Sequence, residues 1–298
     1  MPKLKSLTIK EETNSYFPSK NIIEESSVNP KFEKLYSYLN NLDTKTIPLI
    51  SIILPLYNEE KTIKTILENL PHHHLIEIIV VDDHSEDNSL KEIRQANLPR
   101  KIKIIKHNQN MGYGGALLTG IKNAMGKIIV TMDSDGQHSS DDIFNLVKPI
   151  VEGDADLSIG SRYLGKYFYK LPITTRFGES LLEKLLQILF NIKIKNNQNG
   201  FRAFDRKINY LFTNMNYYGY AFCTELIIKT KLEGYRIKEC PIKVYDRKYG
   251  TSNIILRKLA LRISTCIFQY FLIKHLPLNK NNEDLFIFKV LKKILSYI

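Results

Sequence analysis

The sequence predicts an α/β protein with a doubly wound, mostly parallel sheet that carries helices on both faces. Short β-branched apolar segments bounded by polar turns are the first observation, because strands buried on both faces have this form. Segments with helical periodicity separate them, as in βαβ units. The predicted strands span residues 50–56, 76–81, 102–105, 128–132 and 157–159. The predicted helices span residues 59–70, 87–96, 114–125, 141–151 and 176–190.

The chain divides into three parts. Residues 1–47 are polar and mixed, and we expect an N-terminal extension there. Residues 48–253 contain the alternation of strands and helices and form one α/β domain. Residues 254–298 form a basic, amphipathic C-terminal segment. One short helix in the extension is indicated by apolar residues at helical spacing, namely Phe32, Leu35, Tyr36 and Leu39.

Basic residues are concentrated near the C-terminus. The whole chain has a formal net charge of +12, and residues 229–298 hold 15 Lys and Arg against 5 Asp and Glu. This charge favours an anionic partner, which could be a nucleic acid, an anionic lipid or a phosphorylated substrate. Because the basic region has no recognisable nucleic-acid-binding motif, no nucleic-acid partner is expected.

Targeting signals and cysteine usage favour a cytoplasmic location. The N-terminus lacks the apolar core of a secretory signal. The longest uncharged run near the C-terminus, residues 263–273, is shorter than the ~18–20 residues of a spanning helix. Cys223, Cys240 and Cys266 lie too far apart in the sequence for a disulfide framework or zinc pattern, which favours a reducing compartment.

The C-terminal segment carries an apolar stripe at helical spacing. Arg257, Lys258 and Arg262 flank the stripe. Two interpretations follow: a helix that binds an anionic membrane peripherally, at its cytoplasmic face, or a helix that packs on the α/β domain. The stripe consists of Leu256, Leu259, Ala260, Ile263, Ile267, Tyr270 and Phe271.

Acidic residues follow the fourth predicted strand. Asp133 and Asp135 are separated by one residue, and their carboxylates could hold one Mg²⁺ or Mn²⁺ ion, with open positions left for phosphate oxygens. Gln137 could supply a third oxygen. The alternative is a solvated turn with Gly136 at a positive φ. Because ligands of such sheets bind beyond the carboxyl ends of the strands, the position favours a metal site.

Two further loops end at the same predicted edge. Asp82 and Asp83 follow the second strand, where one could face a ligand while the other caps the next helix. A glycine-rich stretch at residues 112–116 lacks the third glycine of a dinucleotide fingerprint and follows the third strand, so a tight turn into a helix is expected. Tyr57 and Tyr113 could stack on a base or pack as amphipathic side chains.

The order and spacing of these motifs resemble the family 2 glycosyltransferases with the GT-A fold. The upstream motifs are Pro55-x-Tyr57-Asn58-Glu59-Glu60, Val80-Val81-Asp82-Asp83-x-Ser85, Asn110-x-Gly112 and Asp133-x-Asp135-x-Gln137-His138. Downstream motifs look like the dolichol-phosphate mannosyltransferase and polyprenyl-phosphate glycosyltransferase branch. They are Gly160-Ser161-Arg162-Tyr163, Gln198-Asn199-Gly200-Phe201-Arg202, Glu239-Cys240-Pro241-Ile242 and Asp246-Arg247-Lys248-Tyr249-Gly250. Asn196 stands where the branch often has Asp.

The resemblance implies a set of site residues. A nucleotide-sugar would be bound by Pro55, Tyr57, Glu59, Val81, Asp83, Asp133, Ser134, Asp135, Arg162 and Arg247. A divalent ion, Mg²⁺ or Mn²⁺, would be held by Asp133, Asp135 and Gln137. Catalytic roles would belong to Asp135, Arg162, Glu225 and Arg247. For Glu225 the alternative is a structural Glu at the start of a helix.

The expected reaction is metal-dependent transfer of a sugar from a nucleotide-sugar to a polyprenyl phosphate, with inversion. Arg176 and Ser180 lie four residues apart at the start of a predicted helix, so together with the helix N–H groups they could bind the acceptor phosphate. Apolar residues that follow could guide the isoprenoid chain or could pack in the core. They are Leu181, Leu182, Leu185, Leu186 and Leu189.

Two alternative functions are compatible with the sequence. The same fold could transfer the sugar to a cell-envelope saccharide or another hydroxyl acceptor, in which case a general base is needed. A protein of another class, a non-catalytic module that binds a nucleotide-sugar, would keep the pocket and release no sugar. The intact Asp133-x-Asp135 motif and Arg247 argue against the non-catalytic module.

Overall fold

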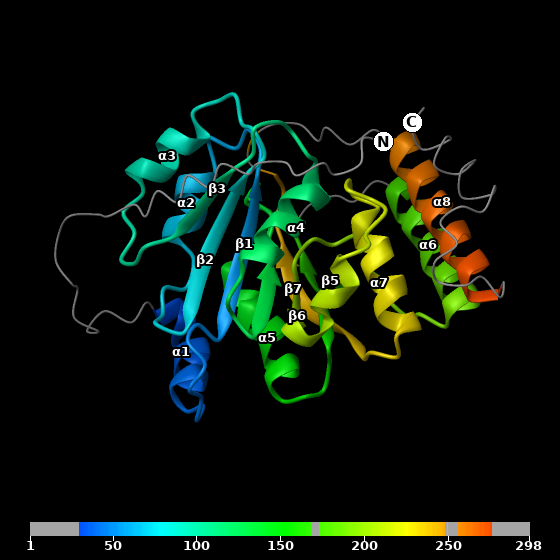
Figure 1. Ribbon diagram of the computed structural model, residues 1–298, viewed down its shortest axis with the longest axis horizontal. Coiled ribbons are helices and arrows are strands. Elements are labelled where there is room, and N and C mark those ends of the chain that lie inside the picture. Colours follow the sequence, from blue (N-terminus) through cyan, green and yellow to red (C-terminus); the bar gives the residue numbers. More distant parts are fainter. Residues whose placement is uncertain (1–29, 169–172, 248, 250–255, 276–298) are drawn as a thin grey trace.

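The computed structural model describes residues 30–168, 173–247, 249 and 256–275. These residues form one seven-stranded sheet in the order β3-β2-β1-β4-β6-β5-β7 (Figure 1). The strands are β1 (Ile50–Leu56), β2 (Ile76–Asp82), β3 (Lys103–Lys106), β4 (Ile128–Thr131), β5 (Leu157–Tyr167), β6 (Arg202–Asp205) and β7 (Ile237–Val244). Only β6 runs antiparallel to its neighbours among the described strands, so the mostly parallel sheet is confirmed.

Strands β3, β2, β1 and β4 match the predicted strands within one residue at each end. They are parallel, and their buried apolar side chains pack on both faces, as in β1, where Ile52 and Ile53 are both fully buried. The carboxyl ends of β1, β2 and β4 therefore meet at one edge of the sheet, where the predicted functional loops begin.

The other half of the sheet departs from the prediction. Strand β5 continues to Tyr167, well beyond the predicted residues 157–159, while β6 and β7 were not predicted. Burial in β7 alternates along the strand, so no continuous apolar run marks it. Strand β6 is four residues long and begins with Arg202, which is only 2% exposed.

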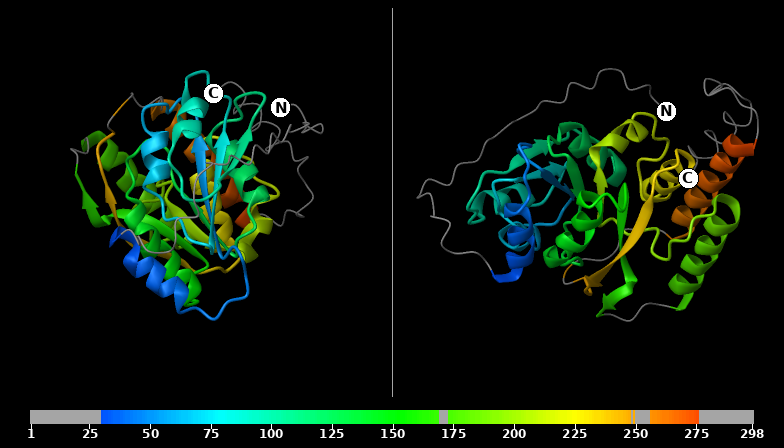
Figure 2. Two further views of the ribbon diagram at one scale, coloured as in Figure 1. Left: turned by 90° about the vertical axis from the view of Figure 1, so that its left-hand side faces the viewer. Right: turned by 90° about the horizontal axis from the view of Figure 1, so that it is seen from below.

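Helices cover both faces of the sheet (Figure 2). The α-helices are α1 (Glu33–Asn40), α2 (Ile63–Glu68), α3 (Ser89–Gln95), α4 (Tyr113–Asn123), α5 (Ile143–Val151), α6 (Ile173–Phe190), α7 (Phe222–Leu232) and α8 (Leu256–His275). One buried apolar cluster joins the sheet to α1, α2, α3 and α5. A second joins the sheet to α4, α6, α7 and α8. The predicted arrangement of helices on both faces is thereby confirmed.

The described part of the N-terminal extension is helix α1, preceded by a 3₁₀ turn, Pro30–Phe32. Leu35 and Leu39 are buried in the first core cluster, as the predicted amphipathic helix requires. The hydroxyl of Tyr36 accepts a hydrogen bond of 2.8 Å from the His72 backbone N–H, so α1 is held against the loop before β2. Residues 1–29 lie outside the described residues.

Helix α8 decides between the two interpretations of the C-terminal stripe. Ile263, Ile267 and Tyr270 are 4–6% exposed and belong to the second core cluster, so this part of the stripe packs on the domain and does not face a membrane. A different face of α8 carries exposed apolar side chains, including Leu261 and Phe268. No helix within the described ranges is long and apolar enough to cross a bilayer.

Candidate active site

The loops that follow β1, β2 and β4 are joined by hydrogen bonds at the carboxyl edge of the sheet. The Ser134 hydroxyl donates to the Pro55 carbonyl at 2.7 Å, and the Thr62 hydroxyl donates to the Ser134 carbonyl at 2.7 Å. The Asn58 backbone N–H donates to Ser85 Oγ at 3.0 Å. These bonds confirm that the three loops converge, and they fix the position of Ser134 between the two predicted metal ligands.

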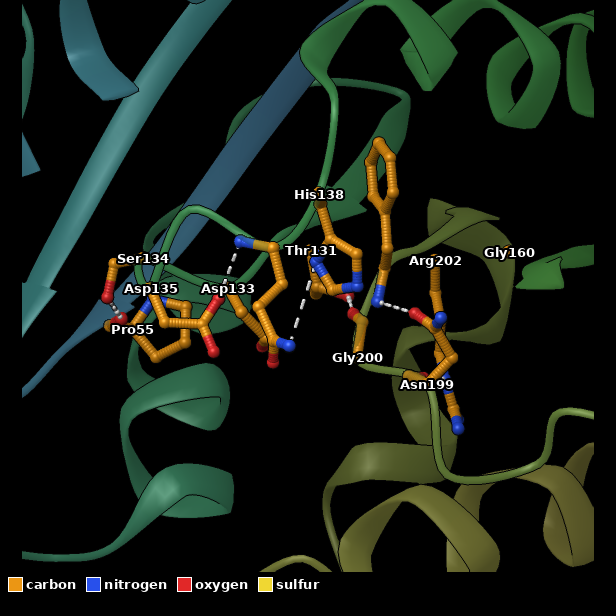
Figure 3. Close-up of polar contacts among 12 residues, drawn as sticks. Pro55, Thr131, Asp133, Ser134, Asp135, His138, Gly160, Asn199, Gly200 and Arg202 are labelled. Carbon is orange, nitrogen blue, oxygen red and sulfur yellow. Dashed lines mark hydrogen bonds and ion pairs between the residues drawn. The ribbon is translucent and has the colours of Figure 1, made fainter. Parts of the chain in front are cut away.

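Asp133 and Asp135 lie side by side on the loop after β4, with Ser134 and Pro55 on one side and His138 and Gly200 on the other (Figure 3). We call Asp133 and Asp135 the carboxylate pair. Burial raises the pKa of Asp133, and the negative charge of Asp135 raises it further. The pair therefore concentrates negative charge in a partly enclosed space, which favours a bound cation.

Arg247 supplies a positive charge to the carboxylate pair. Its Nη2 lies 2.7 Å from Asp135 Oδ2, and Asp135 Oδ1 accepts the Gln137 backbone N–H at 3.0 Å. Glu59 lies near enough for the charge of Asp135 to act on it, and burial together with that charge raises the pKa of Glu59 to about 7. The structure thus brings Arg247 and Glu59 to the pair, and their contacts with a nucleotide-sugar stay predictions.

Gln137, the predicted third metal ligand, is turned towards the end of β7. Its side-chain amide donates to the Tyr245 carbonyl at 3.3 Å, and its own carbonyl accepts the Tyr245 N–H at 2.9 Å. These two bonds hold the loop after β4 against the segment that carries Arg247. In this arrangement Gln137 positions the two loops relative to each other, and its metal contact stays a prediction.

Three residues beside the carboxylate pair were not predicted to act there. The Tyr113 hydroxyl donates to Asp133 Oδ1 at 2.9 Å, and His138 Nδ1 lies 3.8 Å from Asp133 Oδ2. That His138 nitrogen is buried and has no hydrogen-bond partner among the residues that the structure describes. A Cβ on Gly200 would lie 2.6 Å from Asp133 Oδ1, so a larger residue at this position would displace the Asp133 carboxylate. Tyr113 and His138 stand in the motifs already noted, but sequence spacing gave no sign that they converge on Asp133.

Asp83 and Val81 are placed differently from the prediction of direct nucleotide contacts. Asp83 is 3% exposed, and its carboxylate accepts the backbone N–H groups of Met111 and Gly112 at 2.8 Å each, as well as His107 Nδ1 at 2.7 Å. It therefore shapes the glycine turn before α4. Val81 is fully buried in the second core cluster, so its side chain does not line the site.

Arg162 and Arg176 form a second cluster with Tyr163 and Glu179, between β5 and α6. We call these four residues the β5–α6 cluster. The Arg176 guanidinium lies 4.1 Å from the centre of the Tyr163 ring, and the Tyr163 hydroxyl bonds to Glu179. Arg162 Nη2 lies 3.7 Å from Glu179 Oε1. Arg176 Nη1 is buried and has no hydrogen-bond partner in the part of the chain that the structure describes. The two predicted phosphate-binding arginines are thus brought together.

Glu225 does not join either cluster. It is fully buried, and its carboxylate accepts the backbone N–H groups of Asn216 and Tyr217 at 2.8–3.0 Å and the Tyr270 hydroxyl of α8 at 2.7 Å. Burial raises its pKa. These contacts correct the prediction of a catalytic Glu225 and give the residue a structural place between α7, α8 and the segment before α7.

Comparison with known proteins agrees with this site. A family model described as glycosyl transferase family 2 matches residues 51–212. The UDP-N-acetylglucosamine–dolichyl-phosphate N-acetylglucosaminyltransferase of Methanococcus voltae is 35% identical over 237 residues, which cover 72% of this chain and 94% of that protein. The dolichol-phosphate mannosyltransferase of Pyrococcus furiosus is 29% identical over 217 residues, which cover 69% of this chain and 59% of that protein.

A solved structure shares the fold. Glucosyl-3-phosphoglycerate synthase from Mycobacterium tuberculosis, solved with Mn²⁺, UDP-glucose and phosphoglyceric acid, aligns with a TM-score of 0.58 at 20% identity, over 75% of this chain and 80% of that chain. This likeness shows the GT-A fold alone. The family match and the relatives show more: the chain belongs to glycosyltransferase family 2 and is a glycosyltransferase that uses a nucleotide-sugar.

Proposed function

We propose that the protein transfers a sugar from a nucleotide-sugar to a polyprenyl phosphate, with a divalent metal ion and with inversion at the transferred carbon. The observation that carries the acceptor assignment is the β5–α6 cluster. Arg176 and Arg162 bring two guanidinium groups to one place, and within the described ranges the buried Arg176 Nη1 has no hydrogen-bond partner. A phosphate oxygen is a suitable acceptor for that N–H group. The names of the two archaeal relatives support the same acceptor class.

The carboxylate pair fits a divalent ion that is shared with the donor. Among the described residues, no group of three or more His, Cys, Asp and Glu side chains is arranged to hold a metal alone. Asp133 and Asp135 would therefore supply two ligands, and the donor diphosphate would complete the coordination. Such an ion neutralises charge that develops on the leaving diphosphate. The Mn²⁺ and UDP-glucose in the mycobacterial structure support this arrangement.

The protein's own groups have separate tasks in this reaction. Arg247, now paired with Asp135, is placed to bind a diphosphate oxygen when a donor enters, and Tyr113 fixes the orientation of Asp133. An acceptor phosphate is already anionic, so it can attack without a general base. Glu225, which is buried and bonded to α8, is not placed to act as the base that a hydroxyl acceptor would need.

An apolar surface continues from the β5–α6 cluster along α6. Four side chains of α6 on this surface are exposed, namely Phe177, Leu181, Leu185 and Ile188. Leu186 is buried, and Leu182 and Leu189 pack on the second core cluster, so only Leu181 and Leu185 of the five predicted leucines are available to an isoprenoid chain. Helix α8 lies beside α6 (Figures 1 and 2) and has exposed apolar side chains of its own, including Leu261 and Phe268.

The exposed faces of α6 and α8 are the surface we assign to peripheral membrane contact at the cytoplasmic face. Phe177, Ile188 and Phe268 are 73%, 78% and 50% exposed, and burial of such side chains in an interface contributes about 1.5–3 kcal/mol each. Arg257 and Lys258, exposed on α8, suit anionic lipid headgroups. The contact is assigned to these faces because Ile263, Ile267 and Tyr270 of the predicted stripe are buried in the second core cluster.

The direct test offers the purified protein labelled UDP-N-acetylglucosamine, the donor named for the Methanococcus voltae relative, together with dolichyl or undecaprenyl phosphate in detergent. Label should move to the organic phase when Mn²⁺ or Mg²⁺ is present, and EDTA should stop the transfer. The product should have the anomeric configuration opposite to that of the donor. Label that reaches only water or a soluble saccharide would contradict the acceptor assignment.

A further inference from the structure

The segment 216–220, which precedes α7, lies between helix α8 and the carboxylate pair. On one side it is bonded to buried groups of α7 and α8, and on the other it contacts the start of α4 and Tyr113. No motif in the sequence marks this segment. Its contacts nevertheless connect two carboxylates. One is Glu225, which lies outside the site, and the other is Asp133, which lies within it.

Glu225 fixes the first half of the segment. Its carboxylate accepts both Asn216 and Tyr217 backbone N–H groups and also the Asn216 side-chain amide at 3.1 Å. The Tyr270 hydroxyl donates to the same carboxylate at 2.7 Å, and the Tyr217 hydroxyl donates to Gln269 Oε1 of α8 at 3.0 Å. Glu225 is therefore the buried acceptor around which this turn is built.

The second half of the segment reaches the site. The Tyr218 carbonyl accepts the Gly114 N–H at 2.6 Å, at the start of α4. The Tyr220 ring stacks on the Tyr113 ring, with centroids 5.3 Å apart and planes inclined by 18°. Because the Tyr113 hydroxyl donates to Asp133, a displacement of Tyr218 or Tyr220 would change the position of a carboxylate of the pair.

Tyr220 also presents a free surface beside the charged groups of the site. Its side chain is 41% exposed although one ring face covers Tyr113. Burial raises the pKa of Tyr220, and the charges of Asp133, Arg247 and Asp135 act on its hydroxyl. A ring and a hydroxyl at this place suit a base, ribose or sugar that is bound through its diphosphate at the pair.

We propose that the segment 216–220 forms a wall of the donor site, that Tyr220 contacts the bound nucleotide-sugar, and that Glu225 is the positioning residue that holds this wall. The inference rests on the nucleotide-sugar part of the proposed function and does not depend on the lipid acceptor. This positioning role explains why Glu225 is fully buried outside the site. The residue lies one turn into α7, after the end of the wall segment.

The test is a double-mutant cycle read out as the KM for UDP-N-acetylglucosamine and as the affinity for UDP with Mn²⁺. Tyr220→Ala and Glu225→Gln should each raise the donor KM about tenfold. The double variant should be little worse than either single variant, because Glu225 acts through the position of Tyr220. A roughly hundredfold KM in the double variant would mean independent effects and would overturn the inference, as would unchanged donor KM values in the single variants.

Asp156→Asn is the matched control. Asp156 is 3% exposed and accepts the Arg236 backbone N–H at 2.8 Å, but it lies at the start of β5, at the edge of the sheet opposite the site. Its loss should lower thermal stability without changing the donor KM. If Glu225→Gln does not fold, Tyr270→Phe removes one hydrogen bond to the same carboxylate and should give a smaller increase in donor KM of the same kind.

Hydrogen exchange separates this inference from the proposed function, because it needs no ligand. In the free protein, Glu225→Gln should speed exchange of the Asn216 and Tyr217 amides and also of the Gly114 amide, which bonds to Tyr218. Unchanged exchange at Gly114 would overturn the inference whatever the enzyme's substrates are. If the wild-type protein fails to bind UDP or any nucleotide-sugar, the donor contact of Tyr220 and the proposed function are both wrong.

Discussion

The two halves of the sheet differ in the kind of surface that they present to a ligand. In the half that we assign to the donor, called the donor half and formed by β3, β2, β1 and β4, the loops are hydrogen-bonded to one another, as Thr62, Ser134 and Pro55 are. The half that we assign to the acceptor, called the acceptor half, comprises β6, β5 and β7 with α6 and α8. There, the β5–α6 cluster brings two arginines together beside the exposed apolar face of α6, on which Ile188 is 78% exposed.

This difference suits two kinds of ligand. A donor diphosphate with its metal ion needs charges that are already oriented, and the hydrogen bonds to Asp133 and Asp135 provide that orientation. A lipid phosphate brings an apolar chain, so the surface that receives it keeps apolar groups exposed until the ligand or membrane covers them. The comparison therefore predicts that substitutions in each half affect different substrates.

The largest effect is expected in the donor half. Asp135→Asn removes the carboxylate that pairs with Arg247 and that we assign to the metal, and a loss of several kcal/mol of charge stabilisation corresponds to about 10³-fold in turnover. The melting temperature should change little, which circular dichroism can check. Asp154→Asn is the control, because that carboxylate is 54% exposed and lies at the other edge of the sheet. Metal-dependent turnover by folded Asp135→Asn at the wild-type rate would contradict the assignment.

The donor half was also the more predictable half. Buried parallel strands appear in the sequence as continuous apolar runs, and β1 has the predicted bounds at both ends. In β7, exposed residues alternate with buried ones and Pro241 interrupts the run, so the pattern did not stand out. Arg202 opens β6 and is buried because three carbonyls accept its guanidinium N–H groups, an arrangement that composition does not reveal.

The sequence predicted the part of the site whose residues are close together in the chain. Asp133 and Asp135 stand in one short motif, and their side chains do lie together. The residues that complete their surroundings come from distant parts of the chain, such as Tyr113 and Gly200, and only the fold shows that they meet. Glu225 was misassigned for the same reason, because its partners on α8 and in the segment 216–220 cannot be inferred from its neighbours in sequence.

A smaller effect is expected for Gly200→Ala, because Gly200 lies against Asp133, where the two halves meet. In Gly200→Ala the new methyl group would press on the ends of the Tyr113 and Asp133 side chains, which can shift, so we expect a 10–100-fold loss of turnover with little loss of stability. Gly178→Ala on α6 meets no atom within 4 Å and should raise stability by about 0.5–1 kcal/mol without affecting turnover. Normal turnover by Gly200→Ala would show that the orientation of Asp133 is unimportant.

The exposed face of the acceptor half should mediate vesicle binding. Replacing Phe177 and Ile188 by Ser should weaken flotation with anionic vesicles by about tenfold or more, because two apolar side chains no longer enter the interface. Met125→Ser is the control, since Met125 is 64% exposed and lies between α4 and β4 in the donor half. Equal flotation of all three proteins, or none by the wild type at low salt, would remove the membrane assignment.

The smallest effect concerns His73. This residue lies in the loop before β2, against which helix α1 is held. Burial is the main cause that lowers the pKa of His73 to about 4, below its ordinary value near 6.5. The unfolded chain therefore binds a proton that the folded chain does not, and stability should fall as the pH drops from about 6.5 towards 4. In His73→Asn the melting temperature should change less with pH over this range. An equal pH dependence of the melting temperature in the wild type and in His73→Asn over this window would contradict the assignment.

The most direct test of the division between the two halves is a pair of Michaelis constants measured for Arg176→Ala. We expect the KM for dolichyl or undecaprenyl phosphate to rise at least tenfold, because the variant lacks the buried N–H group that has no hydrogen-bond partner among the described residues. The KM for UDP-N-acetylglucosamine should stay within about twofold of the wild-type value. An unchanged KM for the lipid phosphate, or an equal rise in both constants, would contradict the assignment of the β5–α6 cluster to the acceptor.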